Sequence, residues 1–178
     1  MKKILILFLF ALSAPVLHAQ FYSVKTNLLG LVTGNINVEG AVSIHRNWSL
    51  HLPVTYNPFI YSNEKRMQHL TVLPGARYWF LESFSRHFLG FQAICSRFHV
   101  GGLWDKFRYD GQGYGAGLSY GYAKLLSRRL NFEFEAGLGL VYGDYTKYEC
   151  KRCGLPIQKE RKPHLIPTRL GLSLVYLF

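Results

Sequence analysis

The sequence has 178 residues and a formal net charge of +11, although only 17% of its residues are charged. After the N-terminus it contains no apolar run near the 18 or more residues typical of a membrane-spanning helix, which excludes a helical membrane protein. The length fits a single domain, and no recognition motif accompanies the basic charge, which argues against a nucleic-acid-binding protein.

The first residues have the form of a secretory signal peptide. Lys2 and Lys3 supply positive charge, an apolar run covers Ile4 to Leu12, and Ala19 precedes a plausible cleavage site. A membrane anchor is the alternative, but this run is shorter than the roughly 20 residues needed to cross a bilayer. The sequence therefore predicts a signal peptide at residues 1–19 and a mature, exported domain at residues 20–178.

From there on, apolar and polar residues alternate, which is the period of a strand with two different faces. The alternation is strictest in the seventh of eight such segments, where Leu138 and Leu140 share one face and Glu133 and Glu135 share the other. It slips between Ile94 and Ser96, where we expect a β-bulge. The expected strands are Tyr22–Leu31, Ile36–Ile44, Trp48–Asn57, His69–Phe80, Phe88–Val100, Gly113–Ala123, Leu130–Tyr142 and Arg169–Phe178.

Short and long connections alternate between the expected strands. The short ones lie near His45–Asn47, Leu81–His87 and Leu126–Arg129, and the long ones at Pro58–Arg66, Gly102–Gln112 and Gly143–Leu165. Short turns at one end and long loops at the other are typical of bacterial outer-membrane barrels. An even number of strands places both chain ends on the periplasmic side and the long loops outside the cell.

The two strand faces differ in a way that favours a membrane barrel over a soluble, lipocalin-like one. The polar face is rich in Gly and Ser with isolated charges, which suits the narrow interior of an eight-stranded barrel better than a surface in water. The other face carries Leu, Val and Phe, with Tyr and Trp near the strand ends, as lipid contact requires. The prediction is an all-β, eight-stranded antiparallel up-and-down transmembrane β-barrel in the outer membrane of a Gram-negative cell.

Several stretches of the chain are similar to a known family. They are His51–Pro58, Ala76–Phe80, Gly113–Tyr122 and Cys150–Gly154. Together they resemble a family of small outer-membrane barrels from Bacteroidetes known only as a domain of unknown function. The resemblance implies the barrel and its location, and supplies neither an activity nor catalytic residues.

The terminal strand ends at Phe178 and resembles the signal by which the barrel insertion machinery recognises its clients, so that machinery is an expected partner.

On the expected inner face, three positive and three negative charges point to one neutral network. Burial of such charges is tolerable only when they are paired and hydrogen-bonded. We expect a structural plug that closes a narrow barrel; an ion pathway or gate is the alternative hypothesis. The six residues are Lys25, Glu39, Arg77, Glu133, Glu135 and Arg169.

Cys150 and Cys153 form a Cys-x-x-Cys pair in the last expected loop. Export favours a disulfide between them; free thiols, a metal site and a redox motif remain open, although His164 is the only nearby histidine and a zinc site would need two more ligands. We expect neither a metal nor another cofactor. Cys95 stands alone in a strand and is expected to be a packing residue.

Two groups in the expected outer loops are candidates for binding. Basic residues there could contact lipopolysaccharide phosphates, with a solvated, mobile loop as the alternative; they are Lys147, Lys151, Arg152, Lys159, Arg161 and Lys162. An aromatic-anchored contact patch combines Trp104, Phe107, Arg108 and Tyr109.

The sequence therefore predicts a non-catalytic surface or envelope-assembly component that binds a protein partner or lipopolysaccharide through extracellular loops. A lipid A acyl hydrolase or acyltransferase is the alternative. It would need a serine beside a histidine. His99 lies near the outer end of its strand, but Ser96, three residues earlier, points to the opposite face of a regular strand. No catalytic residue is therefore assigned.

Overall fold

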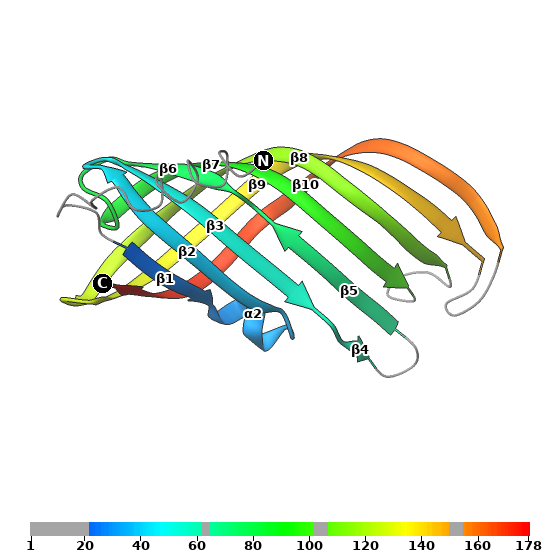
Figure 1. The fold of residues 1–178 in the computed structure, drawn as a ribbon, viewed down its shortest axis with the longest axis horizontal. Helices are drawn as coiled ribbons and strands as arrows, with labels where there is room; N and C mark the ends of the chain where they lie inside the picture. The colour runs from blue at the N-terminus through cyan, green and yellow to red at the C-terminus, as the bar shows by residue number, and fades with distance from the viewer. Residues whose placement is uncertain (1–21, 62–64, 102–106, 150–154) are drawn as a thin grey trace, which may run out of the picture.

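The computed structural model describes residues 22–61, 65–101, 107–149 and 155–178. Its strands belong to one antiparallel sheet that closes on itself (Figure 1). The strands are β1 (Tyr22–Asn27), β2 (Ile36–His45), β3 (Trp48–Asn57), β4 (Ile60–Tyr61), β5 (Lys65–Val72), β6 (Gly75–Trp79), β7 (Arg86–Gly101), β8 (Arg108–Ser127), β9 (Leu130–Tyr148) and β10 (Pro156–Leu177). The expected signal peptide, residues 1–19, lies outside the described residues.

Strands that follow one another in the chain pair with one another, and β1 pairs with β10 to close the ring. β5 and β6 occupy one place in it, because both pair with β3 on one side and with β7 on the other. β4 only extends β5 as a short hairpin. The predicted all-β ring of eight antiparallel strands is confirmed.

The interruption between β5 and β6 falls at Leu73 and Pro74. Proline has no N–H to donate to the ladder, but Leu73 N donates to the carbonyl of Pro53 at 3.1 Å and the carbonyl of Pro74 accepts from Ala93 N at 2.9 Å. The register against β7 is the same on both sides of the break. The β-bulge expected near Ile94 was therefore wrong: β7 is regular there, and the slip came from small and polar residues on both of its faces.

The first strand is shorter than predicted. It ends at Asn27, where the side chain accepts hydrogen bonds from the backbone N–H groups of Leu29 and Gly30 and so caps the single-turn helix α2 (Leu28–Val32). An asparagine in this position satisfies N–H groups that a helix start leaves without partners. The predicted strand therefore stops at Asn27, because the cap starts a helix inside the apolar segment. No helix in the described residues is long or apolar enough to cross a membrane.

The last three strands are longer than predicted. β8, β9 and β10 contain 20, 19 and 22 residues, so residues 108–112 of one expected loop and most of the expected loop at 143–165 are paired strand. Figure 1 shows these strands extending well past β1 and β2, at the end away from the C-terminus. The loop prediction was wrong for residues 108–112, 143–148 and 156–165, because polar and basic side chains on these strands resemble those of a loop. Residues 62–64, 102–106 and 150–154 of the expected loops lie outside the described residues.

An aromatic cluster fills the barrel at the end that carries the short turns. Trp79 and Phe88 are fully buried, with ring centroids 4.6 Å apart, and Phe84 packs 5.6 Å from Trp79. A Cβ atom on Gly121 would collide with the ring of Phe88. Glycine on the inner face therefore makes room for large rings in a narrow interior.

Candidate functional site

The six charged residues predicted to face inward meet at one level of the barrel, next to the aromatic cluster. Lys25 comes from β1, Glu39 from β2, Arg77 from β6, Glu133 and Glu135 from β9, and Arg169 from β10. Their side chains are 2–9% exposed. Alternation along each strand explains why these residues share the inner face; only closure of the ring brings the strands together.

Arg77 lies among all three carboxylates. Its guanidinium is 2.6 Å from Glu135, 3.0 Å from Glu39 and 3.1 Å from Glu133. The guanidinium also lies 4.5 Å from the centroid of Phe88, so it bridges the charges and the aromatic cluster. Arginine suits this role because its planar fork of donors serves several acceptors at once.

Lys25 and Arg169 supply the other two positive charges of this group. Lys25 Nζ is 2.5 Å from Glu133 and 3.3 Å from both Glu39 and Glu135. Nη1 of Arg169 is 3.1 Å from Glu39 and 2.9 Å from Glu135. Three positive charges thus face three negative ones, with each carboxylate paired to at least two cations. We call these six residues the charge network; its side chains lie buried in the barrel interior at this level.

A relay of three further side chains leads from the network toward the short turns. His51 Nδ1 is 2.7 Å from Glu39, and its Nε2 is 2.6 Å from Ser49 Oγ. Trp79 Nε1 donates to the same Ser49 oxygen at 2.7 Å. An ionised carboxylate can only accept, so His51 Nδ1–H donates to Glu39. Nε2 of the neutral ring then carries no proton and accepts from the Ser49 hydroxyl, whose oxygen accepts from Trp79 Nε1.

The order of hydroxyl, imidazole and carboxylate is that of a hydrolytic triad. Ser49, however, is 0% exposed and His51 is 5% exposed, with Trp79 bonded to the serine oxygen. A buried hydroxyl without access to substrate cannot act as a nucleophile, so the relay orients side chains. Sequence reasoning missed it, although the spacing of two between Ser49 and His51 on one strand face was a usable signal.

Above the charge network lies a cavity of about 330 Å³ that we call the seam cavity. Lys25, Glu39, Glu135 and Arg169 border it on the inner side. Its remaining lining comes largely from the α2 region, β2, β3 and the part of β10 next to Thr168. The cavity is thus located where β1 ends and α2 begins.

At the end of the barrel opposite the short turns, the predicted aromatic patch forms a cluster with the basic hairpin. Lys147 Nζ lies 3.8 Å above the Phe107 ring and 6.0 Å from the centroid of Tyr109. The Arg108 guanidinium lies 4.2 Å above the Tyr148 ring. The structure therefore joins the two predicted binding groups through cation–π contacts between β8 and β9.

The other described basic residues lie on β10, paired with β9, and not in a mobile loop. Arg161 Nε is 2.9 Å from Asp144, and Lys159 Nζ is 3.6 Å from the same carboxylate. Both basic side chains remain about 60% exposed. The strand gives them a fixed direction, which the loop interpretation did not provide.

Lys162 forms an ion pair with a neighbouring residue of its own strand. Its Nζ is 2.9 Å from Glu160, which also accepts a hydrogen bond from the Tyr145 hydroxyl at 3.1 Å. The bond from Lys162, followed by that from Tyr145, holds the pKa of Glu160 below its usual range. This carboxylate stays ionised near neutral pH, so Lys162 is largely neutralised.

Part of both predicted binding groups, Trp104 together with Lys151 and Arg152, lies outside the described residues. So does the expected disulfide pair, Cys150 and Cys153. Cys95 is exposed on the outer face of β7, so it does not pack in the barrel interior.

A family model with the description "Protein of unknown function (DUF3575)" matches residues 4–178. The chain belongs to the DUF3575 family. The resemblance inferred from sequence stretches is confirmed at the level of the family. No curated protein matches the chain.

The DUF3575 description names no activity, so chemistry has to be argued from side chains. Within the described ranges, no group of three or more His, Cys, Asp or Glu residues is arranged to hold a metal ion. His99 is 3.1 Å from Asp110 on the outer face of the barrel, and in the described part of the chain this is its only side-chain partner. Ser96 faces inward and bonds to Thr71 at 2.8 Å.

Proposed function

We propose that this chain is a non-catalytic outer-membrane barrel that contacts lipopolysaccharide phosphates at its extracellular end. The main observation behind this proposal is the position of Lys159 and Arg161. Both are exposed cations on the outward face of a paired hairpin, and both lie beyond the apolar band of the barrel wall. Cations at that level would face the phosphates of the outer leaflet. The filled barrel would serve as a rigid anchor.

The outer wall supports the membrane setting. Leu118, Leu138 and Leu140 are about 60% exposed in the described barrel, and a contiguous apolar surface of this kind marks contact with lipid or protein. Apolar side chains that are 36–64% exposed recur around the ring, at Val24, Val38, Leu50, Leu52, Leu70, Phe91, Phe134, Leu170 and Leu174. Such a belt is costly in water and favourable in a bilayer.

Aromatic side chains border this belt. Outward-facing tyrosines at 122 and 114 of β8 are eight residues apart, or about 26 Å along a strand. With a tilt near 40°, the band between them is about 20 Å tall, close to the ~25 Å of outer-membrane barrels. At the short-turn end, Trp48 packs on Tyr78 with ring centroids 5.2 Å apart, as in an interfacial girdle.

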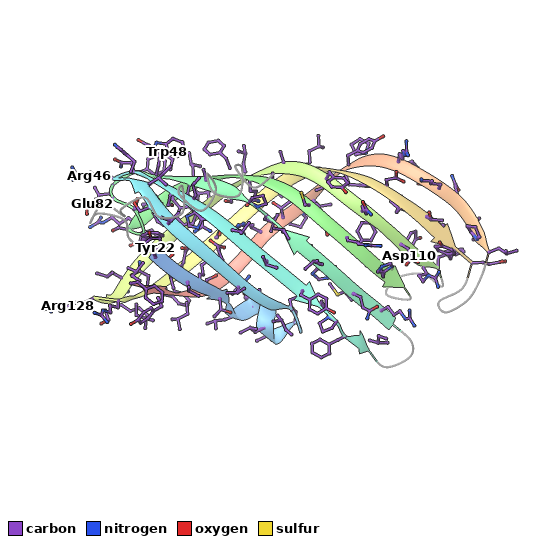
Figure 2. The ribbon with its side chains drawn as sticks, in the orientation of Figure 1. Tyr22, Arg46, Trp48, Glu82, Asp110 and Arg128 are labelled. Carbon is purple, nitrogen blue, oxygen red and sulfur yellow. The ribbon has the colours of Figure 1, made fainter. Side chains whose placement is uncertain are left out.

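Charged side chains lie beyond the aromatic ones at the same end. In Figure 2, Arg46, Glu82 and Arg128 project from the turns, while Trp48 lies one step further in. Arg46 and Glu82 form an exposed ion pair at 2.9 Å. The order of turn charges, aromatic rings and then aliphatic side chains is the order of water, interface and hydrocarbon.

Lipopolysaccharide is favoured over a protein partner by the outward direction of Arg161 and Lys159. Their shared carboxylate, Asp144, neutralises at most one of the two charges. Guanidinium and ammonium groups bind phosphate oxygens through charge-assisted hydrogen bonds. A hairpin with this spare positive charge is suited to a phosphate on a neighbouring lipid.

The test uses the folded chain in lipid nanodiscs and a double variant, Lys159→Ala with Arg161→Ala. We expect its affinity for purified lipopolysaccharide to fall about tenfold or more at low salt, and the wild-type affinity to fall as salt rises. The matched control removes two basic residues at the opposite end, Lys124→Ala with Arg128→Ala, and should bind as the wild type does. Equal binding by both double variants would contradict the proposal.

Location is tested separately. The chain expressed in its native envelope should fractionate with outer membranes, and the folded form should migrate differently from the boiled form on a gel. Recovery as a soluble periplasmic protein would contradict the membrane setting. An enzyme remains the second candidate because of the outward His99–Asp110 pair; lipid A mass spectrometry of a deletion strain, complemented with wild type or with His99→Ala, decides it.

A further inference from the structure

The outward wall of β7, β8, β9 and β10, which run side by side in Figure 1, contains an open groove. We call it the wall groove; its volume is about 1110 Å³ and its lining is largely apolar. The larger side chains that line it are on outward positions and are 39–71% exposed; they include Leu89, Phe91, Leu118, Leu138, Leu140 and Leu165. The groove is therefore part of the surface that faces lipid in the proposed membrane setting.

The groove follows from the order of small and large side chains on neighbouring strands. Ala93 of β7 pairs with Ala116 of β8, and two residues away Phe91 pairs with Leu118. Residues paired across a ladder lie next to each other on one face of the sheet. Two alanines beside two large side chains leave a depression, and all four residues line the groove.

Further along the same strands, the wall changes from apolar to charged. One row across β7, β8, β9 and β10 consists of Arg97, Gln112, Asp144 and Arg161, since each residue is paired with the next. This row, which we call the cation row, is four residues from the alanine pair, or about 13 Å along the strands. Both of its arginines are exposed, so two guanidinium groups lie beyond one end of the groove.

Tyrosines occupy the row between the groove and the cation row. Tyr114 of β8 pairs with Tyr142 of β9, and both are more than half exposed. The Tyr114 hydroxyl donates to Gln112 Oε1 at 2.8 Å, so this side chain leans toward the cation row. Cations, tyrosines and an apolar groove thus follow one another on a single face. The phosphate, the interfacial part and the acyl chain of an anionic lipid have the same order.

The charges favour an anionic lipid over a second copy of the chain. A copy that covered the groove about a two-fold axis along the membrane normal would bring both cation rows to the same level. Arg97 and Arg161 would then lie near those of the other copy, and like charges repel. Asp144 is the single carboxylate of the row, so an approaching phosphate meets an excess of positive charge.

We propose that the wall groove holds an acyl chain of a lipopolysaccharide molecule whose phosphate contacts Arg97 and Arg161. The inference rests on the lipopolysaccharide contact proposed above and deepens it. It makes the acyl chain a second point of recognition, and it adds Arg97 to the cations that bind phosphate. Because apolar contact and ion pairing are separate contributions to affinity, each can be removed without the other.

The experiment compares intact lipopolysaccharide with a fully deacylated form that keeps its phosphates, each added to the full chain in phosphatidylcholine nanodiscs. Ala116→Phe fills the groove and should weaken binding of the intact form about tenfold, with binding of the deacylated form unchanged. The control Gly40→Phe adds a ring on the outward face of β2, where a Cβ atom meets nothing within 4 Å, and should bind both forms as the wild type does. Equal affinity of wild type and Ala116→Phe for the intact form would overturn the proposal. If Ala116→Phe fails to fold, Ala93→Phe takes its place.

Further variants separate the head group from the acyl chain. Arg97→Gln should weaken binding of both forms about fivefold, whereas Arg128→Gln at the opposite end should not; unchanged binding by Arg97→Gln would overturn the proposed head contact. If Lys159→Ala with Arg161→Ala has no effect while Ala116→Phe weakens binding of the intact form, the phosphate contact proposed above fails and the groove is supported. If Ala116→Phe converts a dimer to a monomer in light scattering without changing lipid binding, the groove is an interface between copies and the proposal is overturned.

Discussion

Two regions of this barrel contain the same kinds of charged residue in opposite circumstances. In the charge network each carboxylate lies within 3.3 Å of at least two cations and almost no side-chain surface is exposed. On the outer hairpin, Arg161 and Lys159 share Asp144 and stay about 60% exposed. Burial makes every member of the first group dependent on the others, while water screens the second. Similar types of residue therefore form a structural element at one level and an adaptable surface at another.

The largest expected effect comes from removing one buried charge. Glu135→Gln leaves Arg77, Lys25 and Arg169 with one carboxylate fewer, and we expect a loss of about 3–5 kcal/mol in the free energy of unfolding. Reversible urea unfolding in detergent, followed by the mobility difference between folded and unfolded forms, measures it. The control Glu82→Gln breaks the exposed pair with Arg46 and should cost about 1 kcal/mol or less. Similar losses in both variants would show that burial does not distinguish the two regions.

A smaller effect is expected in the relay. Ser49→Ala removes the acceptor for Trp79 Nε1 and the donor to His51, and should cost about 1–3 kcal/mol because both partners are buried. The same unfolding assay applies, with Ser127→Ala at the exposed end of β8 as the control. An unchanged midpoint for Ser49→Ala would mean that water replaces the hydroxyl.

On the outer hairpin we expect stability to change little. Asp144→Asn removes the partner of both Arg161 and Lys159, and should change the free energy of unfolding by about 0–1 kcal/mol, less at high salt. Its effect on binding should have the opposite sign to that of the cation removal, with tighter association to lipopolysaccharide. Weaker lipopolysaccharide binding by Asp144→Asn would show that the carboxylate positions the cations.

The smallest expected effect is a change in the pKa of Glu160. Tyr145→Phe removes a hydrogen bond that favours the ionised form of Glu160, so the pKa of that carboxyl should rise toward its ordinary value. A lowered carboxyl pKa stabilises the fold above the unfolded pKa, and that contribution disappears as pH falls through the folded pKa. NMR titration of the labelled carboxyl measures the change. A pKa unchanged in Tyr145→Phe would assign the whole shift to Lys162.

Much of the fold could be predicted because a two-residue period is a local property. Alternation at Leu138 and Leu140 against Glu133 and Glu135 predicted which side chains face inward, and the inner face at this level is indeed buried. The errors arose where local rules compete. Asn27 capped a helix inside an apolar segment, and polar residues on the outer part of β10 obscured a strand that is held by pairing to β9.

The candidate sites were predictable only in part. Charge on the inner face predicted a network, but partners came from strands more than 100 residues apart, as with Lys25 and Glu133. The cap at Asn27 depends on nearby residues. Its consequence, that the pairing of β1 with β10 stops at Asn27, depends on where β10 lies after closure.

By itself the sequence determined which residues share a face, how many strands form and where net charge accumulates, since these follow from period, turn residues and composition. Tertiary structure alone decided register and closure. A shift by one residue would turn every inner side chain outward, so the contacts of Arg77 with three carboxylates and the bond from Trp79 to Ser49 exist only after the ring has closed.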